Sequence, residues 1–422
     1  MKKLKEIGPN IGSNFTLLGV DVADGVNGYR KNFNLGVKKN KISFIEQNRS
    51  EGVLVDGSDY ILLPGMINSH THCAMGFLRG AAHDVVDPIN NLFFRAESQL
   101  DETKVEQLSY GYIASGLKSG VTTFFDHYYF SLGVGRALEK LGARGFIGET
   151  LADTGGAFPN PNGLELFIAQ TKNWPFSELV KPILCPHATD TVSKTMAHKI
   201  AEAQQKLGLP LHSHLSQTKG EWDFCLKTYG KSPIAVASDF GWLGKNSQMV
   251  HVIYAENLDW KLLKDSQVHL VCCPSSAIIY DKLADTKKWI EEELTFHVAS
   301  DCAASADHCD LWTEIKVMAL MLKNQGYKNI SVYGDIYNSV TSIPADFVNC
   351  QIGQLKQGYL ADFIFIKKNF EMYPINDLFT YLLFSVTNQK VEHVVVDGKF
   401  VVWDHSLVNL DEQDFYVPEI KY

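Results

Sequence analysis

Two histidines separated by one residue, His70 and His72, close an apolar run that begins at Pro64. In an extended strand, successive side chains alternate between the two faces, so both imidazoles point to the same side. Imidazole nitrogens are common ligands of divalent metals, and two of them on one face supply half of a four-coordinate site. The pair therefore predicts a metal site, provided that further ligands end neighbouring strands.

Further polar side chains stand at the ends of later strand-like segments. They follow one another along the chain as His187, His214, His251 and Asp301. In a (β/α)8 barrel the carboxyl ends of all strands meet on one face, where active sites lie. Burying so many imidazoles and a carboxylate without a function would be costly. The sequence therefore predicts one site that is assembled from several strand ends.

The segments that must position these side chains alternate between strand-like and helix-like patterns from about residue 64 to residue 352. Strands are expected at 120–126, 180–185, 209–214, 248–251, 268–272 and 296–301, and helices at 105–118 and 196–207. Repeated strand–helix units are typical of a parallel sheet, and about eight of them close into a barrel. We therefore expect an α/β chain whose middle is a (β/α)8 TIM barrel.

Both ends of the chain are rich in short strands instead. The expected strands lie at 15–20, 33–37 and 41–45 near the N-terminus and at 362–366, 391–396 and 400–403 near the C-terminus. Turn residues separate them, including the hairpin signal Asp397-Gly398. We predict that residues 1–63 and 353–422 together form a small β-sandwich domain beside a barrel domain of residues 64–352.

Composition and charge narrow the classes of partner. The 422 residues are 45% apolar and 21% charged, which suits a large folded core. A formal charge of −9 without a basic block argues against nucleic acid. Because no apolar stretch reaches the roughly 20 residues that span a bilayer, we expect no membrane partner. We expect no signal peptide because Gly8, Pro9, Asn10 and Gly12 interrupt the segment after the basic N-terminus. Eight cysteines without a C-x-x-C pair favour reduced thiols and a cytoplasmic location.

Several ordered motifs resemble those of the amidohydrolase superfamily, in particular its deaminase and chlorohydrolase branch. They lie at residues 63–72, 120–123, 186–188, 212–215, 250–251, 273–276, 300–305 and 353–362. The resemblance extends over nearly the whole chain and is specific in order and spacing. It implies a single metal ion on a barrel that is flanked by a β-sandwich.

The resemblance also implies a role for each candidate residue. The positions that match the metal ligands are His70, His72, His214 and Asp301. Three imidazoles and a carboxylate suit one divalent ion, Zn²⁺ in the first place and Fe²⁺ in the second. His251 matches the catalytic histidine that orients or polarises the metal-bound water, and Asp301 both ligates the metal and accepts the water's proton. Glu97 and His187 resemble residues that hold the substrate.

The implied reaction is hydrolysis of a carbon–nitrogen bond other than a peptide bond. Metal-activated water would add to an electrophilic ring carbon. We therefore expect an amidohydrolase-superfamily aminohydrolase that deaminates a nitrogen heterocycle such as a purine, pterin, pyrimidine or triazine. The expected partner is that small molecule, with no nucleic acid and no membrane, and a homodimer is compatible with the sequence.

One candidate catalytic residue departs from the deaminase pattern. The family usually has a glutamate three residues after the histidine of the fifth barrel strand, where this chain has Gln217. An amide donates and accepts hydrogen bonds but cannot shuttle a proton to a leaving amine. Three alternatives stay open. Another group, Glu221 or Asp190, relays the proton; or the leaving group is not an amine, as in a chlorohydrolase; or the chain binds metal and ligand but catalyses poorly.

Overall fold

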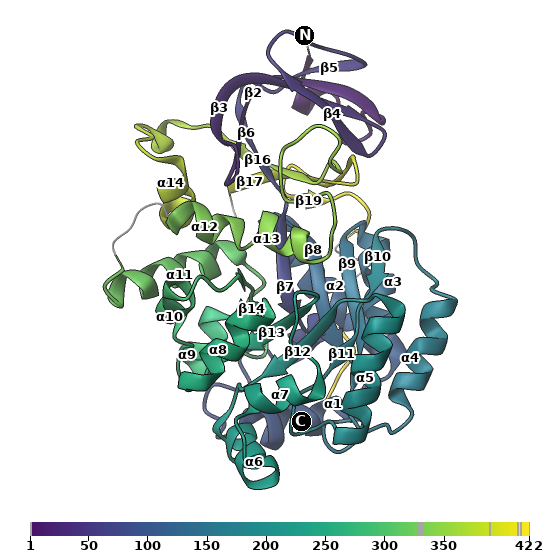
Figure 1. Ribbon diagram of the computed structural model, residues 1–422. Coiled ribbons are helices and arrows are strands. Elements are labelled where there is room, and N and C mark those ends of the chain that lie inside the picture. The colour runs from purple at the N-terminus through teal and green to yellow at the C-terminus, as the bar shows by residue number, and fades with distance from the viewer. Residues whose placement is uncertain (1, 328–331, 388–389, 412, 414–415, 422) are drawn as a thin grey trace.

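The computed structural model describes residues 2–327, 332–387, 390–411, 413 and 416–421. Strands from both ends of the chain share one sheet at the top of Figure 1, and parallel strands with helices around them occupy the lower part. The fold is thus mixed α/β. Among the described residues, no helix combines the length and the apolar character needed to cross a membrane.

Two parallel sheets make up the middle of the chain. The first contains β7 (Met66–Thr71), β8 (Val121–Tyr128), β9 (Arg144–Leu151), β10 (Val180–Pro182) and β11 (Cys185–Pro186). The second contains β12 (Leu211–Leu215), β13 (Ser247–His251), β14 (His269–Cys272) and β15 (Phe296–Val298). Parallel bridges join their edges on both sides, Leu184 to Leu211 and Thr71 to Asp301. The arrangement is therefore TIM-barrel-like.

Helices connect the parallel strands and lie outside them (Figure 1). They are α1 (Phe94–Glu97), α2 (Glu102–Ser119), α3 (Ser131–Leu141), α4 (Gly163–Lys172), α5 (Lys194–Leu207), α6 (Lys219–Tyr229), α7 (Pro233–Phe240), α8 (Asn257–Ser266), α9 (Pro274–Tyr280), α10 (Thr286–Glu291), α11 (Leu311–Asn324), α12 (Val332–Asn338) and α13 (Ser342–Phe347). The helix that bears on the site, α6, begins at a Thr218 side chain that accepts the N–H of Glu221 and ends at a left-handed Gly230. Both are standard signals for a helix start and stop, because they satisfy terminal backbone groups.

The remaining sheet combines both ends of the chain. Its N-terminal strands are β1 (Lys2–Lys3), β2 (Asn14–Asp24), β3 (Gly28–Lys38), β4 (Lys41–Glu46), β5 (Val53–Asp56) and β6 (Tyr60–Pro64). Its C-terminal strands are β16 (Phe363–Lys367), β17 (Val391–Val396), β18 (Lys399–Trp403) and β19 (Ser406–Leu407), with α14 (Leu378–Ser385) between β16 and β17. The two halves meet where β6 pairs antiparallel with β16. The strands that the sequence predicts at both ends are thereby confirmed, most of them with longer bounds.

A buried ion pair links this sheet to the parallel strands. Arg144, the first residue of β9, donates from Nε to Asp362 Oδ2 at 2.8 Å and from Nη2 to Asp362 Oδ1 at 3.1 Å. Both side chains are almost completely buried. Removing either partner would leave an uncompensated buried charge, which is strongly destabilising. The pair therefore fixes β9 against the entry to β16.

Two of the strands that the sequence predicts are shorter than expected. The segment 180–185 is divided into β10 and β11, and β10 ends at Pro182, a residue that has no N–H to continue a ladder. The segment 296–301 is extended only as far as Val298. Beyond it the chain crosses toward β7, and the N–H of Asp301 donates to the carbonyl of His70 at 3.2 Å. This crossing brings Asp301 beside the histidine pair.

Candidate metal centre

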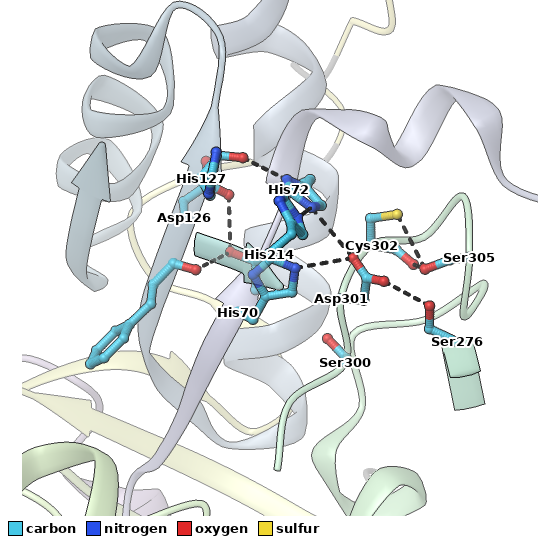
Figure 2. Close-up of polar contacts among 12 residues, drawn as sticks. His70, His72, Asp126, His127, His214, Ser276, Ser300, Asp301, Cys302 and Ser305 are labelled. Atoms are coloured by element: carbon cyan, nitrogen blue, oxygen red, sulfur yellow. Dashed lines mark hydrogen bonds and ion pairs between the residues drawn. The ribbon is translucent and has the colours of Figure 1, made fainter. Parts of the chain in front are cut away.

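The residues predicted as ligands come together at the carboxyl ends of three strands (Figure 2). Asp301 Oδ1 lies 3.4 Å from the Nε2 atoms of both His70 and His72. His214, near the end of β12, places its Nε2 atom 3.2 Å from Nε2 of His72. Side chains separated by up to 231 residues in sequence thus present ligand atoms to one small volume.

In His72 and His214 the Nδ1 atom faces a backbone acceptor, which leaves the Nε2 atom free to bind a metal. The Nδ1 atom of His72 lies 2.5 Å from the carbonyl oxygen of His127, and that of His214 lies 2.9 Å from the carbonyl oxygen of His187. Since a carbonyl oxygen only accepts, both Nδ1 atoms carry the hydrogen and both Nε2 atoms carry a lone pair. This arrangement is typical of metal-binding histidines.

His70 is oriented by another histidine. Its Nδ1 atom lies 2.8 Å from Nε2 of His212, and both rings are fully buried. If His70 offers Nε2 to a metal, its Nδ1–H donates to His212, which then carries its own hydrogen on Nδ1. His212 is the contact that the sequence prediction missed. The signal was present, because His212 and His214 repeat the spacing of His70 and His72.

The remaining donor atoms fit a divalent cation. Within the described part of the chain, Nε2 of His70 and Nε2 of His251 are buried without any hydrogen-bond partner. Donor nitrogens of His70, His214 and His251 lie within 4.8 Å of one another, as do those of His70 and His72 with an oxygen of Asp301. Unpaired buried polar atoms are costly, and a cation among them would remove that cost. The residues present therefore fit one divalent metal ion.

Burial and neighbouring groups shift the pKa values of these side chains toward the forms that bind a metal. Burial lowers the pKa of His70 to about 4 and that of His251 to about 3, so both imidazoles are neutral at pH 7. Burial alone would raise the pKa of Asp301, but the nearby imidazoles of His70, His251 and His72 keep it well below its usual range. Ser276 Oγ donates to Asp301 Oδ2 at 2.7 Å, which leaves Oδ1 for the centre.

Backbone strain is concentrated at two of these positions. His251 has a φ of +78° and Asp301 a φ of +65°. Residues other than glycine rarely adopt this left-handed region, and such strain persists where the surrounding structure holds a side chain in a required direction. His251 is the last residue of β13, and Asp301 follows the end of β15 by three residues. The turn aims the side chain at the centre instead of along the sheet.

A cavity of about 450 Å³ opens onto the centre. His72, His214, His251 and Asp301 line it, and so do the predicted substrate residues Glu97 and His187 and the departing residue Gln217. Aromatic rings of Phe93, Phe94, Tyr128, Tyr129 and Tyr280 supply flat apolar walls. Among the described residues that line it there is no lysine and no arginine, whereas six are acidic. The cavity suits a flat, partly apolar molecule without negative charge.

The two predicted substrate residues both line this cavity. Glu97 ends α1 and is buried, and burial raises its pKa to about 8 although the nearby Tyr128 hydroxyl acts in the opposite direction. His187 follows β11, and its Nδ1 atom lies 2.7 Å from Oγ1 of Thr191. Burial lowers the pKa of His187 to about 4. A protonated carboxyl and a neutral imidazole both donate and accept hydrogen bonds.

Gln217 and Glu221 are neighbours at the start of α6. Glu221 Oε2 accepts the backbone N–H of Gln217 at 2.9 Å, and Oε1 accepts the hydroxyl of Thr189 at 2.6 Å. Burial raises the pKa of Glu221, and the nearby carboxylate of Asp190 raises it further. Glu221 and Asp190 both line the cavity. The two alternative proton carriers that the sequence suggested are therefore brought together beside Gln217.

Comparisons with known proteins identify the family of the chain. The family model described as "Amidohydrolase family" matches residues 61–401, which is most of the chain. The chain belongs to the amidohydrolase family.

Two named relatives and one solved structure are similar to this chain over most of its length. The chain is 28% identical over 373 residues to the 5'-deoxyadenosine deaminase of Methanosphaera stadtmanae, covering 86% of this chain and 87% of that one. It is 29% identical over 398 residues to the 5-methylthioadenosine/S-adenosylhomocysteine deaminase of Carboxydothermus hydrogenoformans, covering 89% and 90%. A zinc-bound adenosine deaminase structure from Xanthomonas campestris superposes with a TM-score of 0.88 at 20% identity, covering 95% of each chain.

Proposed function

We propose that this chain is a metal-dependent aminohydrolase that removes the amino group of an adenine-like heterocycle, with an uncharged or cationic nucleoside as its substrate. The convergence of His70, His72, His214 and Asp301, with unpaired buried nitrogens facing inward, carries the proposal. The named activities of the relatives support an adenine-type ring. The expected partner is this small molecule.

The metal would be held by the three histidines and Asp301. A bound divalent ion, Zn²⁺ in preference to Fe²⁺ given the nitrogen and oxygen donors, supplies a water of lowered pKa. His251, which is neutral and has an unpaired Nε2 atom, orients the attacking water by accepting or donating one hydrogen bond. Asp301 Oδ2 is held by Ser276, so Oδ1 faces the centre and receives the proton.

The leaving amine needs a proton that Gln217 cannot supply. Glu221 and Asp190 both line the cavity; burial raises the pKa of each, and the Asp190 carboxylate raises that of Glu221 further, so the pair retains a proton near neutral pH more readily than an isolated carboxyl. We infer that this pair delivers the proton to the leaving nitrogen. Gln217 then orients the ring through its side-chain amide.

Glu97 and His187 are proposed to hold the substrate. Because burial keeps Glu97 protonated at pH 7, its carboxyl donates as well as accepts and so matches neutral hydroxyl or ring nitrogen groups. The absence of lysine and arginine among the described lining residues disfavours a substrate with a free carboxylate or phosphate. Phe93 and Phe94 offer flat surfaces for a ring.

The architecture that goes with this function is a (β/α)8 barrel of residues 64–352 with a β-sandwich from 1–63 and 353–422. The two parallel sheets and the bridges at both of their edges support the barrel, and the sheet shared by both ends supports the second domain. Such a barrel would explain why ligands from β7, β12 and the segment after β15 meet.

The proposed function is tested with a panel of amino-substituted heterocycles. Metal-replete protein should release ammonia from 5'-deoxyadenosine or 5-methylthioadenosine, and less readily from analogues that carry a free carboxylate. Asp301→Asn serves as the control that removes a ligand without changing size. If no heterocycle of the panel yields ammonia, the proposal fails.

A second candidate is hydrolysis with a leaving group other than an amine, and Gln217 favours it because such a group needs little protonation. Chloride release from a chlorinated triazine without ammonia release from any aminopurine would establish this alternative. The reverse pattern would exclude it.

A further inference from the structure

A second cluster of donor atoms lies beneath the first one. His127 belongs to β8, Cys185 to β11 and His212 to β12. One nitrogen of each histidine and the sulfur of Cys185 all lie within 4.8 Å of one another. All three side chains are buried, with exposed fractions of 1% or less. None of them is among the ligands proposed for the catalytic metal.

The donor atoms of this cluster lack other partners. Within the described residues, both ring nitrogens of His127 and the Nδ1 atom of His212 have no hydrogen-bond partner. The sulfur of the Cys185 thiol lies as far as 4.0 Å from the carbonyl oxygen of Asp126, to which it donates. A buried imidazole with neither nitrogen paired is costly, so the cluster requires an explanation.

The backbone makes room for the cluster at one glycine. Gly148 lies on β9 between the two strands concerned, in register with His127. A Cβ atom at this position would lie 2.4 Å from Sγ of Cys185 and 2.4 Å from the carbonyl oxygen of Ile183. A side chain at position 148 would therefore displace the thiol, and glycine is needed there for the sulfur to face the same interior as the two imidazoles.

We propose that His127, Cys185 and His212 form a second cation site, for a thiophilic metal ion such as Zn²⁺, in the interior below the catalytic centre. Two imidazoles and one thiolate are a typical donor set for such an ion. On binding, the thiol loses its proton to solvent and the sulfur bonds to the metal. Burial raises the pKa of the Cys185 thiol, and the carboxylates of Asp126 and Glu149 raise it further, so a bound cation is what would favour the thiolate there.

The two sites are linked through one hydrogen bond. On binding the second ion, His212 would lose its Nδ1 hydrogen to solvent and ligate through Nδ1, while its Nε2 still accepts from Nδ1 of His70, at 2.8 Å. With both sites filled, His212 is therefore an imidazolate that one nitrogen joins to the ion and the other to the hydrogen bond from His70. The site does not depend on the proposed deaminase activity, since it rests on donor atoms outside the catalytic set.

Cobalt binding tests the proposal without any assay of activity. The full-length protein is stripped with a chelator and titrated with Co²⁺, and its absorption and metal content are recorded. The proposal predicts about two Co²⁺ per chain and a thiolate-to-cobalt charge-transfer band. One Co²⁺ per chain without such a band would overturn it and leave a dry imidazole cluster.

Variants locate the thiolate. Cys185→Ala should remove the band and lower the content to about one Co²⁺ per chain, while Cys272→Ala, another buried cysteine, should keep both. Gly148→Ala retains every ligand but displaces the thiol, so it should also abolish the band. It replaces Cys185→Ala as the test if that variant does not fold. Cys273 has its sulfur near His251 and Asp301. A band that survives Cys185→Ala and disappears in Cys273→Ala would place the thiolate at the catalytic centre and overturn the proposal.

Discussion

The carboxylate of Glu221 accepts the backbone N–H of Gln217 at 2.9 Å, so the residue that departs from the deaminase pattern directly contacts an acid. The contact arises because Thr218 caps α6 and brings Glu221 into its first turn. The carboxyl of Glu221, one helical turn further along the chain, thus lies beside position 217, where the family usually has a glutamate. The geometry favours relocation of the proton carrier over its loss.

Substitution of Glu221 tests this relocation. Glu221→Gln keeps the size of the side chain but has no proton to transfer, so kcat should fall by roughly 10²–10⁴-fold, the usual contribution of a general acid. Metal content should stay unchanged because Glu221 is outside the ligand set. Ammonia release measured at saturating substrate, with metal content in parallel, checks the prediction. A kcat within about threefold of the unsubstituted protein would assign the proton to another group.

The variant Gln217→Glu distinguishes an active enzyme from an impaired one. If Glu221 and Asp190 already deliver the proton, a new carboxyl at 217 adds little, and kcat should rise by less than about tenfold. In the double variant Gln217→Glu with Glu221→Gln, activity should recover, because a carboxyl is again present. A large gain in the single variant from an inert starting protein would instead support the poorly catalytic alternative.

His212 should matter for metal affinity although it does not ligate the catalytic metal. It holds Nδ1 of His70, and partners of this kind are worth about 10–100-fold in metal affinity. His212→Ala should weaken Zn²⁺ binding in a competition with a chelator by that factor. The matched control is His269→Ala, which removes another half of a buried histidine pair, the 2.9 Å contact with His297. Equal affinities in the two variants would contradict the orienting role.

Glu97 should make stability depend on pH. Its pKa is raised by burial from 4.5 to about 8, so between these values the folded chain binds more protons than the unfolded chain. The free energy of unfolding should therefore decrease as pH rises from about 5 to 8, by up to roughly 1.4 kcal/mol per pH unit from this group. Glu97→Gln, which mimics the protonated form, should flatten the curve. Denaturant unfolding at several pH values measures this free energy. Parallel dependence on pH in the unsubstituted protein and in Glu97→Gln would show that Glu97 is ionised in the folded chain.

The convergence of the candidate ligands could be predicted from the sequence because it follows from local rules, whereas the resemblance to the amidohydrolase superfamily singled out the expected ligand set. Alternation along a strand puts His70 and His72 on one face, and the shared carboxyl ends of parallel strands bring His214 and Asp301 to them. Glu221 was placed near Gln217 by helical spacing alone.

Other features depend on the packed structure. The contact between His70 and His212 joins residues 142 positions apart, and the ion pair between Arg144 and Asp362 joins residues 218 apart. The left-handed backbone at Asp301, which follows from the chain crossing to β7, has no local signature such as glycine. These features set ring orientation and depth, which spacing does not determine.

The central claim is that a metal held by His70, His72, His214 and Asp301 supports removal of an amino group from an adenine-like ring. Its most direct test measures ammonia from 5'-deoxyadenosine with the Zn²⁺-loaded protein, the chelator-stripped protein and the Asp301→Asn variant. The account predicts one ammonia per substrate consumed by the loaded protein, and loss of release by at least about 10²-fold in the other two. Equal release by the stripped protein, or no release by a protein that retains its metal, would contradict it.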